Sequence, residues 1–213
     1  MISRGAVIRS PDQDATCLEP ACPAETALRG LNMRLSRFGY FFDFFAYPAL
    51  LIALGFLGTH AQDARRLVIW ATVYLAAMAF WTLLEYLLHR FALHHLPVLR
   101  QMHHRHHVEE EACDGTPTWI SIPAFGILAF LPSYFIFNFF LASAITDGLM
   151  SGYLWYISVH HLLHHRRPDP PGYASNLRRR HALHHHFDET TNFGVTSGFW
   201  DHVFRTHARV SAR

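Results

Sequence analysis

The longest stretches of this chain without a charged side chain constrain its fold most. Eighteen uncharged residues lie between Arg66 and Glu85, and 32 more run from Gly115 to Thr146. A helix needs about 20 mostly apolar residues to cross the hydrocarbon core of a bilayer. Two further apolar stretches follow the same pattern: 39–58, and 148–160, which can be extended to 163. The sequence therefore predicts an all-α integral membrane protein with about four transmembrane helices.

The composition agrees with this prediction. The chain is 51% hydrophobic and 16% charged, whereas a soluble domain usually has about 25% charged residues. Buried helices of a soluble α protein are the alternative, but the apolar runs are long and aromatic for that class. The net charge of +2 gives no indication of a nucleic-acid partner. Cys17, Cys22 and Cys113 have neither metal-ligand nor disulfide spacing, so we expect free thiols.

The chain divides into three parts. Residues 1–37 contain charges and prolines without the sustained apolar core of a signal peptide, and we expect a flexible leader there. Residues 38–206 form the expected membrane domain, and 207–213 a short tail. Asp43 and Pro48 interrupt the first apolar stretch, and we expect Asp43 to lie near the lipid headgroups.

Arginine counts in the short loops predict the orientation. Arginines precede the first span and follow the second and fourth, while the opposite loops carry only Arg65 and Arg66. Because cytoplasmic loops are enriched in basic residues, we expect both termini on the cytoplasmic side, in a bacterial inner membrane. Spans two and four should then end together on the cytoplasmic face.

Ten of the eighteen histidines fall into four spaced clusters at the ends of these spans. Residues three and four apart share a helix face, so each histidine triplet is expected to aim at one point. Imidazole is the commonest metal ligand and suits iron, zinc, copper and nickel. Ten ligands exceed the four to six positions of one ion, which indicates two metal ions. The ten are His89, His94, His103, His106, His107, His160, His164, His181, His184 and His185.

Doubled histidines leave one ambiguity of register, because His161 and His165 are also four apart and could replace His160 and His164. Two carboxylates are candidates to accept the spare imidazole N–H and orient the rings. Glu85 lies one turn before His89, and Asp188 one turn after His184; ordinary interfacial charge is the alternative for both. Six histidines are expected on the surface or behind the ligands: His60, His95, His104, His186, His202 and His207.

A metal site beside the bilayer implies an apolar substrate that enters sideways from the lipid. Unactivated C–H bonds require a strong oxidant, which paired iron ions and dioxygen supply. The Glu-x-x-His pairs of carboxylate-bridged di-iron bundles are missing from the sequence, as is a Ser or Cys nucleophile beside a base. A metal transporter is a further alternative, but transporters place polar ligands near the bilayer midplane, and these histidines lie at helix ends.

The order of the histidine motifs resembles that of the fatty acid hydroxylase/sterol desaturase superfamily over about residues 38–206. The first two motifs are 85–91, and 103–107 followed by Asp-Gly-Thr-Pro at 114–117. Residues 156–165 are similar to the third motif. The C-terminal segments look most like the fatty acid 2-hydroxylase branch: 180–187, 192–197 and 199–201.

The resemblance implies a four-span helical enzyme with a dinuclear metal centre held by the ten histidines above. Such an enzyme inserts one oxygen atom of dioxygen into a C–H bond of a fatty acyl chain. Iron is the expected metal, although zinc could occupy the site after purification. Residues 1–37 are too short for a fused cytochrome domain, so the resemblance implies a separate electron donor, such as a ferredoxin or a b-type cytochrome with its reductase. A sterol or carotenoid oxidase or desaturase of the same superfamily is the alternative, and the spacing of the motifs favours the acyl branch.

Overall fold

The computed structural model describes residues 35–110, 112–113, 115–166 and 171–208, and every regular element within them is a helix. The predicted all-α fold class is confirmed. The expected leader lies almost entirely outside the described residues, as do Cys17 and Cys22 and most of the expected tail. In chain order the elements are α2 (Arg37–Thr59), α3 (Ala64–Leu87), η1 (Leu88–Leu93), α4 (Pro97–Val108), α5 (Thr118–Phe125), η2 (Gly126–Phe130), α6 (Leu131–Ile136), α7 (Phe139–His165), α8 (Tyr173–His186) and α9 (Phe199–Val203), where η1 and η2 are π-helical.

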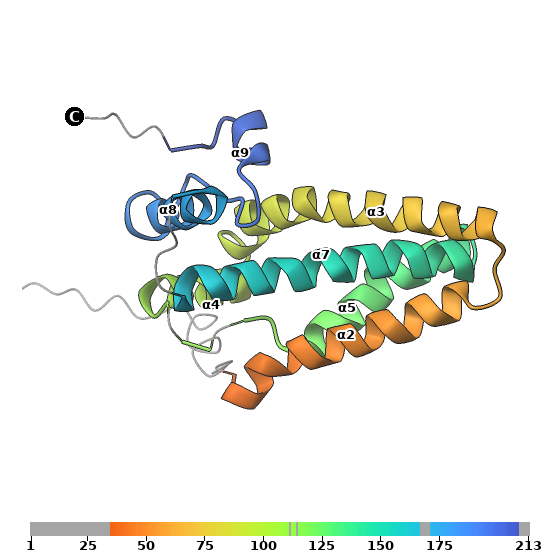
Figure 1. Ribbon diagram of the computed structural model, residues 1–213. Helices are drawn as coiled ribbons and strands as arrows, with labels where there is room; N and C mark the ends of the chain where they lie inside the picture. The colour runs from red at the N-terminus through yellow and green to blue at the C-terminus, as the bar shows by residue number, and fades with distance from the viewer. Residues whose placement is uncertain (1–34, 111, 114, 167–170, 209–213) are drawn as a thin grey trace, which may run out of the picture. The chain divides into compact units, whose positions relative to one another are not determined.

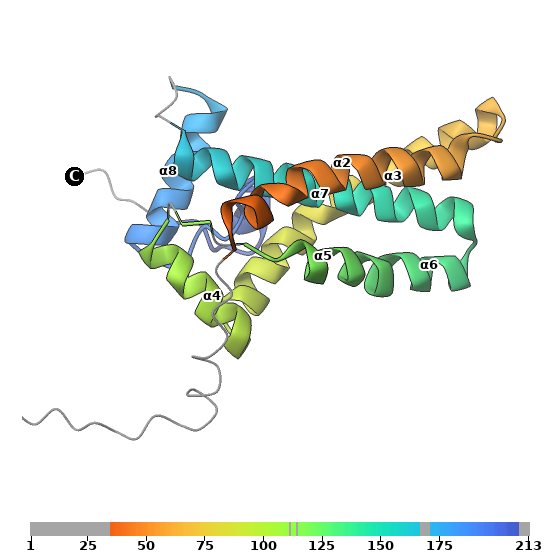
Figure 2. The same cartoon turned by 90° about the horizontal axis from the view of Figure 1, so that it is seen from below.

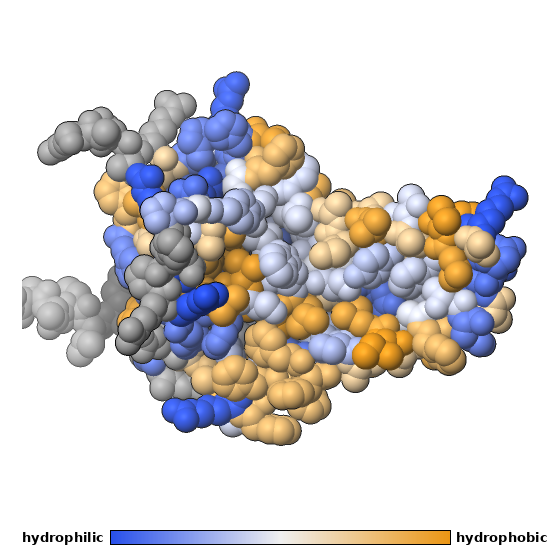
Figure 3. All heavy atoms as spheres, viewed as in Figure 1, coloured by the Kyte–Doolittle hydropathy of each residue, from blue (hydrophilic) through white to orange (hydrophobic). Residues whose placement is uncertain are grey.

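Among the described residues, three helical stretches are long and apolar enough to cross a membrane: Arg37–Thr59, Ala64–Leu93 and Thr118–Ile136. Many of their large apolar side chains face outward; Phe135, for example, is 79% exposed. Figure 3 shows apolar residues over the long helices and hydrophilic ones at the end that carries α8 and at the α2–α3 turn. A surface of this kind is unfavourable in water and is solvated by lipid.

The boundary between the third and fourth predicted spans was wrong. The uncharged run 115–146 contains a turn at Phe137 and Asn138, and α7 begins directly after it. Asn138 caps α7, because its side-chain oxygen accepts a hydrogen bond from Leu141 N at 3.0 Å. An asparagine between phenylalanines carries no charge, so hydropathy alone does not show the turn. Helix α7 has 27 residues but is not one of these three stretches, because it carries polar residues such as Ser143 and Asp147.

Helix α7 lies at the centre of the bundle and packs against α2, α3 and α6 (Figures 1 and 2). Its buried side chains form a core with those of α2 and α3, which comprises Tyr47, Trp81, Leu149, Met150 and Tyr153. Glycines permit a close approach of α3: a Cβ at Gly148 would overlap the backbone at Tyr74, and one at Gly152 would overlap the Trp81 side chain. Small residues at helix contacts are typical of membrane bundles.

The histidine-bearing segments meet at the end of the bundle where α3 and α7 finish (Figure 1). Helix α3 continues into η1, whose hydrogen bonds join residues five apart. This wider turn brings His89 and His94 to one face, with ring centroids 5.3 Å apart. Pro97 then starts α4 at a first-turn position, where its missing N–H costs nothing.

Candidate metal centre

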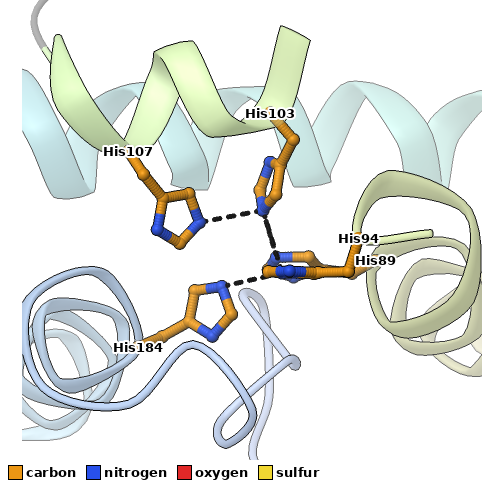
Figure 4. A group of neighbouring side chains, drawn as sticks. All are labelled: His89, His94, His103, His107 and His184. Atoms are coloured by element: carbon orange, nitrogen blue, oxygen red, sulfur yellow. Dashed lines mark hydrogen bonds between the residues drawn. The ribbon is translucent and has the colours of Figure 1, made fainter. Parts of the chain in front are cut away.

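All ten predicted histidines converge, in two groups of five. Within each group, one ligand nitrogen from each residue lies within 4.8 Å of the others. The first group, shown in Figure 4, is His89, His94, His103, His107 and His184. The second group is His106, His160, His164, His181 and His185. The groups adjoin, since the rings of His107 and His185 stack with centroids 4.1 Å apart.

The expectation that each histidine triplet aims at one point was wrong. On α4, His103 and His107 belong to the first group and His106 to the second. On α8 the division is reversed, with one histidine in the first group and two in the second. The residues four apart stay together, while the third member lies on a neighbouring strip of the helix and reaches the other group. Both helices therefore bridge the two groups.

Backbone carbonyls fix the tautomers of two rings in the first group. His89 Nδ1 lies 2.6 Å from the carbonyl oxygen of Phe193, and His184 Nδ1 lies 2.7 Å from that of Thr191. A carbonyl oxygen only accepts, so each Nδ1 is the donor and each neutral ring directs a bare Nε2 lone pair into its group.

The Nε2 atoms of the first group are too close to be satisfied by hydrogen bonds among themselves. His103 Nε2 lies 3.0 Å from His89 Nε2, 3.1 Å from His94 Nε2 and 2.9 Å from His107 Nε2. A neutral imidazole has one N–H, which cannot serve three partners, and His89 has no proton at this position. A central cation would be attracted by all of these lone pairs, so the donor set fits a metal ion.

In the second group, a carboxylate accepts the outer imidazole proton, whereas backbone carbonyls do so in the first group. His164 Nδ1 donates to Glu110 Oε2 at 3.2 Å, and Glu110 Oε1 lies 2.8 Å from His186 Nε2. His164 Nε2 is then unprotonated and lies 2.8 Å from His181 Nε2. Both ring nitrogens of His185 are buried without a hydrogen-bond partner in the described residues. This group also presents more lone pairs than it has protons to share.

Burial keeps the rings neutral. Burial, followed by repulsion from neighbouring imidazoles, lowers the pKa of His106 and of His107 to about 3. Burial also lowers the pKa of His184 to about 4. A neutral imidazole is the form that binds metal ions, so these rings are ready to act as ligands at physiological pH.

Glu85 and Asp188 were expected to accept imidazole N–H groups, but the hydrogen bonds that they accept come from other donors. Glu85 is buried and accepts hydrogen bonds from Val195 N, Thr196 N and Thr196 Oγ1, at 2.8, 2.8 and 2.6 Å. Asp188 Oδ1 accepts from Thr190 N and Oγ1, and these bonds lower the pKa of Asp188. Backbone carbonyls take the imidazole protons instead, because the loop around 191–196 reaches both rings.

The ambiguity of register is answered by the geometry. His161 Nδ1 lies 3.0 Å from the hydroxyl of Tyr40, and its ring stacks on His165 at 4.4 Å, outside both groups. The pair His160 and His164 faces the second group. The six histidines expected elsewhere also lie outside the groups, although His186 contacts the site through Glu110.

Sequence reasoning missed the residues that hold the imidazoles in place. Glu110 gave no signal, since it lies in an ordinary acidic stretch, and backbone carbonyls have no sequence signature.

Asp201 was singled out only as part of a motif. It is fully buried and accepts from Phe193 N, Gly194 N and Thr206 Oγ1, and from Arg180 Nη2 at 2.7 Å. Asp201 and Glu85 thus clamp the loop 193–196 from two sides.

The fold and the site define a class: a helical membrane protein in which ten imidazoles form two adjoining groups at the end of apolar helices. The family model for fatty acid hydroxylase matches residues 74–206, and the chain belongs to this family. The predicted superfamily is therefore confirmed.

Curated relatives lie in the predicted branch. The chain is 31% identical to the ceramide very long chain fatty acid hydroxylase scs7 of Schizosaccharomyces pombe, over 63% of this chain and 42% of that protein. It is 30% identical to the fatty acid 2-hydroxylase of Rattus norvegicus, over 63% of this chain and 39% of that protein. It is 33% identical to the dihydroceramide fatty acyl 2-hydroxylase FAH2 of Arabidopsis thaliana, over 62% of this chain and 59% of that protein. The matched region thus spans less than two thirds of each relative. The relatives are named as hydroxylases, which are oxidoreductases.

A solved structure shares the fold. The hydroxylase domain of full-length scs7p superposes with a TM-score of 0.69 at 23% identity, covering 80% of this chain and 67% of that one.

Proposed function

We propose that this protein is a membrane lipid hydroxylase that inserts one oxygen atom of dioxygen into a C–H bond of a fatty acyl chain. The observation that carries the proposal is the pair of five-imidazole groups. In the first group, the fixed tautomers of His89 and His184 direct bare nitrogens inward. Membership of the fatty acid hydroxylase family supports the substrate class.

The ten histidines would hold two metal ions, five to each, and we propose iron as the native metal. When bound, paired iron ions supply with dioxygen the oxidising chemistry that an unactivated C–H bond requires. The protein's own residues would bind the metal ions and orient the imidazoles that hold them. Phe193 and Thr191 hold His89 and His184 through their carbonyls, and Glu110 holds His164. The burial of rings such as His89 and His184 would limit the access of water to the ions.

We further propose that residues 38–206 form the functional membrane domain, with α7 as the fourth membrane helix. The arginine distribution supports cytoplasmic termini and a cytoplasmic metal site in a bacterial inner membrane. Electrons would come from a separate donor of the ferredoxin or b-type cytochrome kind, with its reductase. These proposals rest on the sequence pattern and the family.

Metal analysis and lipid mass spectrometry test the metal and the reaction together. The wild type, His106→Ala, His184→Ala and the control His104→Ala are expressed with a ferredoxin and its reductase. His104 is exposed, neighbours His103 and lies outside both groups. We expect an acyl lipid that gains one oxygen atom in the wild type and the control only. His106→Ala and His184→Ala should each lower the metal content while membrane insertion stays intact. Full metal content and full activity in either variant would contradict the ligand assignment.

A further inference from the structure

A cavity adjoins both imidazole groups. Its walls include His103 of the first group and His106 and His160 of the second. Most of the remaining walls are apolar or aromatic, and they include Phe44, Leu93, Leu99, Met102, Tyr156 and Ile157. An acyl chain fits a cavity of this character, and a carbon within it would lie beside the histidines of both groups.

One carboxylate breaks this apolar wall. Asp43 of α2 lines the cavity and is only 5% exposed. Its Oδ1 accepts a hydrogen bond from the Thr118 hydroxyl, and its Oδ2 accepts one from the Tyr153 hydroxyl at 3.0 Å. Asp43 was expected near the lipid headgroups; its carboxylate is turned inward, toward Thr118 of α5 and Tyr153 of α7.

Asp43 retains hydrogen-bonding capacity for a ligand. The two carboxylate oxygens have about four acceptor positions, and Thr118 and Tyr153 use two of them. A buried carboxylate in a membrane helix is costly and is usually functional. Asp43 contacts no member of either imidazole group through these bonds, and it lies outside the residues 74–206 that match the family model.

We propose that Asp43 determines which lipid head group the cavity accepts. Its carboxylate accepts a hydrogen bond from a neutral polar head that carries an N–H or O–H, such as an amide or an alcohol, and repels a carboxylate head. This proposal rests on the proposed function, because it assumes that the cavity beside the histidines holds the acyl chain.

The physical basis is the low polarity of the wall around Asp43. A hydrogen bond between a carboxylate and a buried donor is roughly twice as strong as a neutral one. Two carboxylates in the same apolar cavity repel each other, and this repulsion is larger there than in water. A single buried carboxylate therefore favours donor-bearing neutral lipids by attraction and disfavours anionic ones by repulsion.

Three lipids with the same saturated acyl chain separate these effects: N-palmitoylethanolamine, methyl palmitate and palmitate. The first is neutral with donors, the second is neutral without them, and the third is anionic. Binding to the purified full-length protein in detergent is measured by calorimetry. In the wild type we expect the ethanolamide to bind about tenfold more tightly than the ester, and palmitate more weakly than both.

Asp43→Asn should change this order, and Asp147→Asn is the matched control. Asp147 is also a buried carboxylate of the bundle, but it does not line the cavity. Asp43→Asn should lower the affinity for the ethanolamide by about tenfold and raise the affinity for palmitate, whereas Asp147→Asn should preserve the wild-type order. An unchanged order in a folded Asp43→Asn variant would overturn the proposal.

If Asp43→Asn fails to fold, the affinities of the wild type for the three lipids still test the proposal. Equal affinity of the wild type for palmitate and for the ethanolamide, or no binding of any of the three lipids, would overturn head-group selection. Hydroxylation is assayed separately on the same lipids with the electron donor present. Selective binding without hydroxylation would contradict the proposed function and leave Asp43 as the determinant of lipid binding.

Discussion

At the scale of single residues, the two imidazole groups differ in the acceptors that bind their outer imidazole protons. In the first group, carbonyl oxygens of Phe193 and Thr191 accept the outer imidazole protons. In the second, the carboxylate of Glu110 contacts His164 and approaches His185 to 3.8 Å. A carboxylate partner makes an imidazole a more basic ligand than a carbonyl does. The second group is therefore expected to hold its ion with more negative charge nearby.

Glu110→Gln tests this difference. An amide cannot supply the negative charge that Glu110 shares with His164 and His186, so metal affinity at the second group should fall by about 10- to 100-fold. Metal analysis after dialysis against a chelator should show the content falling from two ions per chain toward one. The first group, whose ring partners are carbonyls, is the internal control. Equal loss from both groups would contradict the assignment of Glu110 to one of them.

Asp201→Ala addresses the clamp on the loop 193–196. The change leaves the Arg180 guanidinium and two backbone N–H groups without their acceptor, which should lower the free energy of unfolding by about 3 kcal/mol. Denaturant titration in mixed micelles measures the loss. Asp63→Ala, which removes the exposed N-cap of α3, should cost only about 1 kcal/mol. Equal losses would mean that the clamp adds nothing to stability.

At the scale of elements, the structure depends on how closely α3 approaches α7. That approach requires glycine at 152, since any larger side chain there overlaps Trp81. Helix α3 continues directly into η1, which carries His89, and α7 carries His160. The spacing of the two helices therefore contributes to the spacing of the imidazoles.

Two glycines provide a matched pair for this element. Gly152→Ala should cost about 1–3 kcal/mol, because the added methyl group has no space. Gly126→Ala, where nothing lies within 4 Å of the added Cβ, should be neutral or slightly stabilising, because alanine favours helices. Thermal unfolding of the two purified variants measures the difference. A Gly152→Ala variant as stable as the wild type would show that the helices can separate without cost.

Most elements could be predicted from the sequence, and the failures have physical causes. Hydropathy located α2 and α3 because a bilayer selects long apolar runs, but it did not show the turn at Asn138. The five-residue spacing of His89 and His94 does not suit an α-helix, and only the π-helical η1 explains it. The ten histidines could be found because imidazole is distinctive. Their division into two groups could not be predicted, because it depends on how α4 and α8 face each other.

At the scale of the whole molecule, the apolar surface and the arginine pattern predict that the histidine-bearing end of the bundle faces the cytoplasm. Cys113, a free thiol, lies between the histidine-bearing α4 and the apolar α5. In a Cys17→Ser, Cys22→Ser background, a membrane-impermeant maleimide should label Cys113 only after the cytoplasmic face is opened. In the matched variant, which also lacks Cys113 and carries Ala61→Cys in the α2–α3 turn, labelling should occur in intact cells. The reverse pattern would place the histidines on the outer face.

The bridging of both groups by α4 and α8 has a consequence for biosynthesis. A nascent chain that stops before α8 carries seven of the ten histidines, and the carbonyl of Phe193 that orients His89 has not yet been made. Neither group can be completed until α8 and the loop after it have left the ribosome. If the two groups bind metal ions as proposed, the order of translation should delay that binding until α8 and the loop after it have been synthesised.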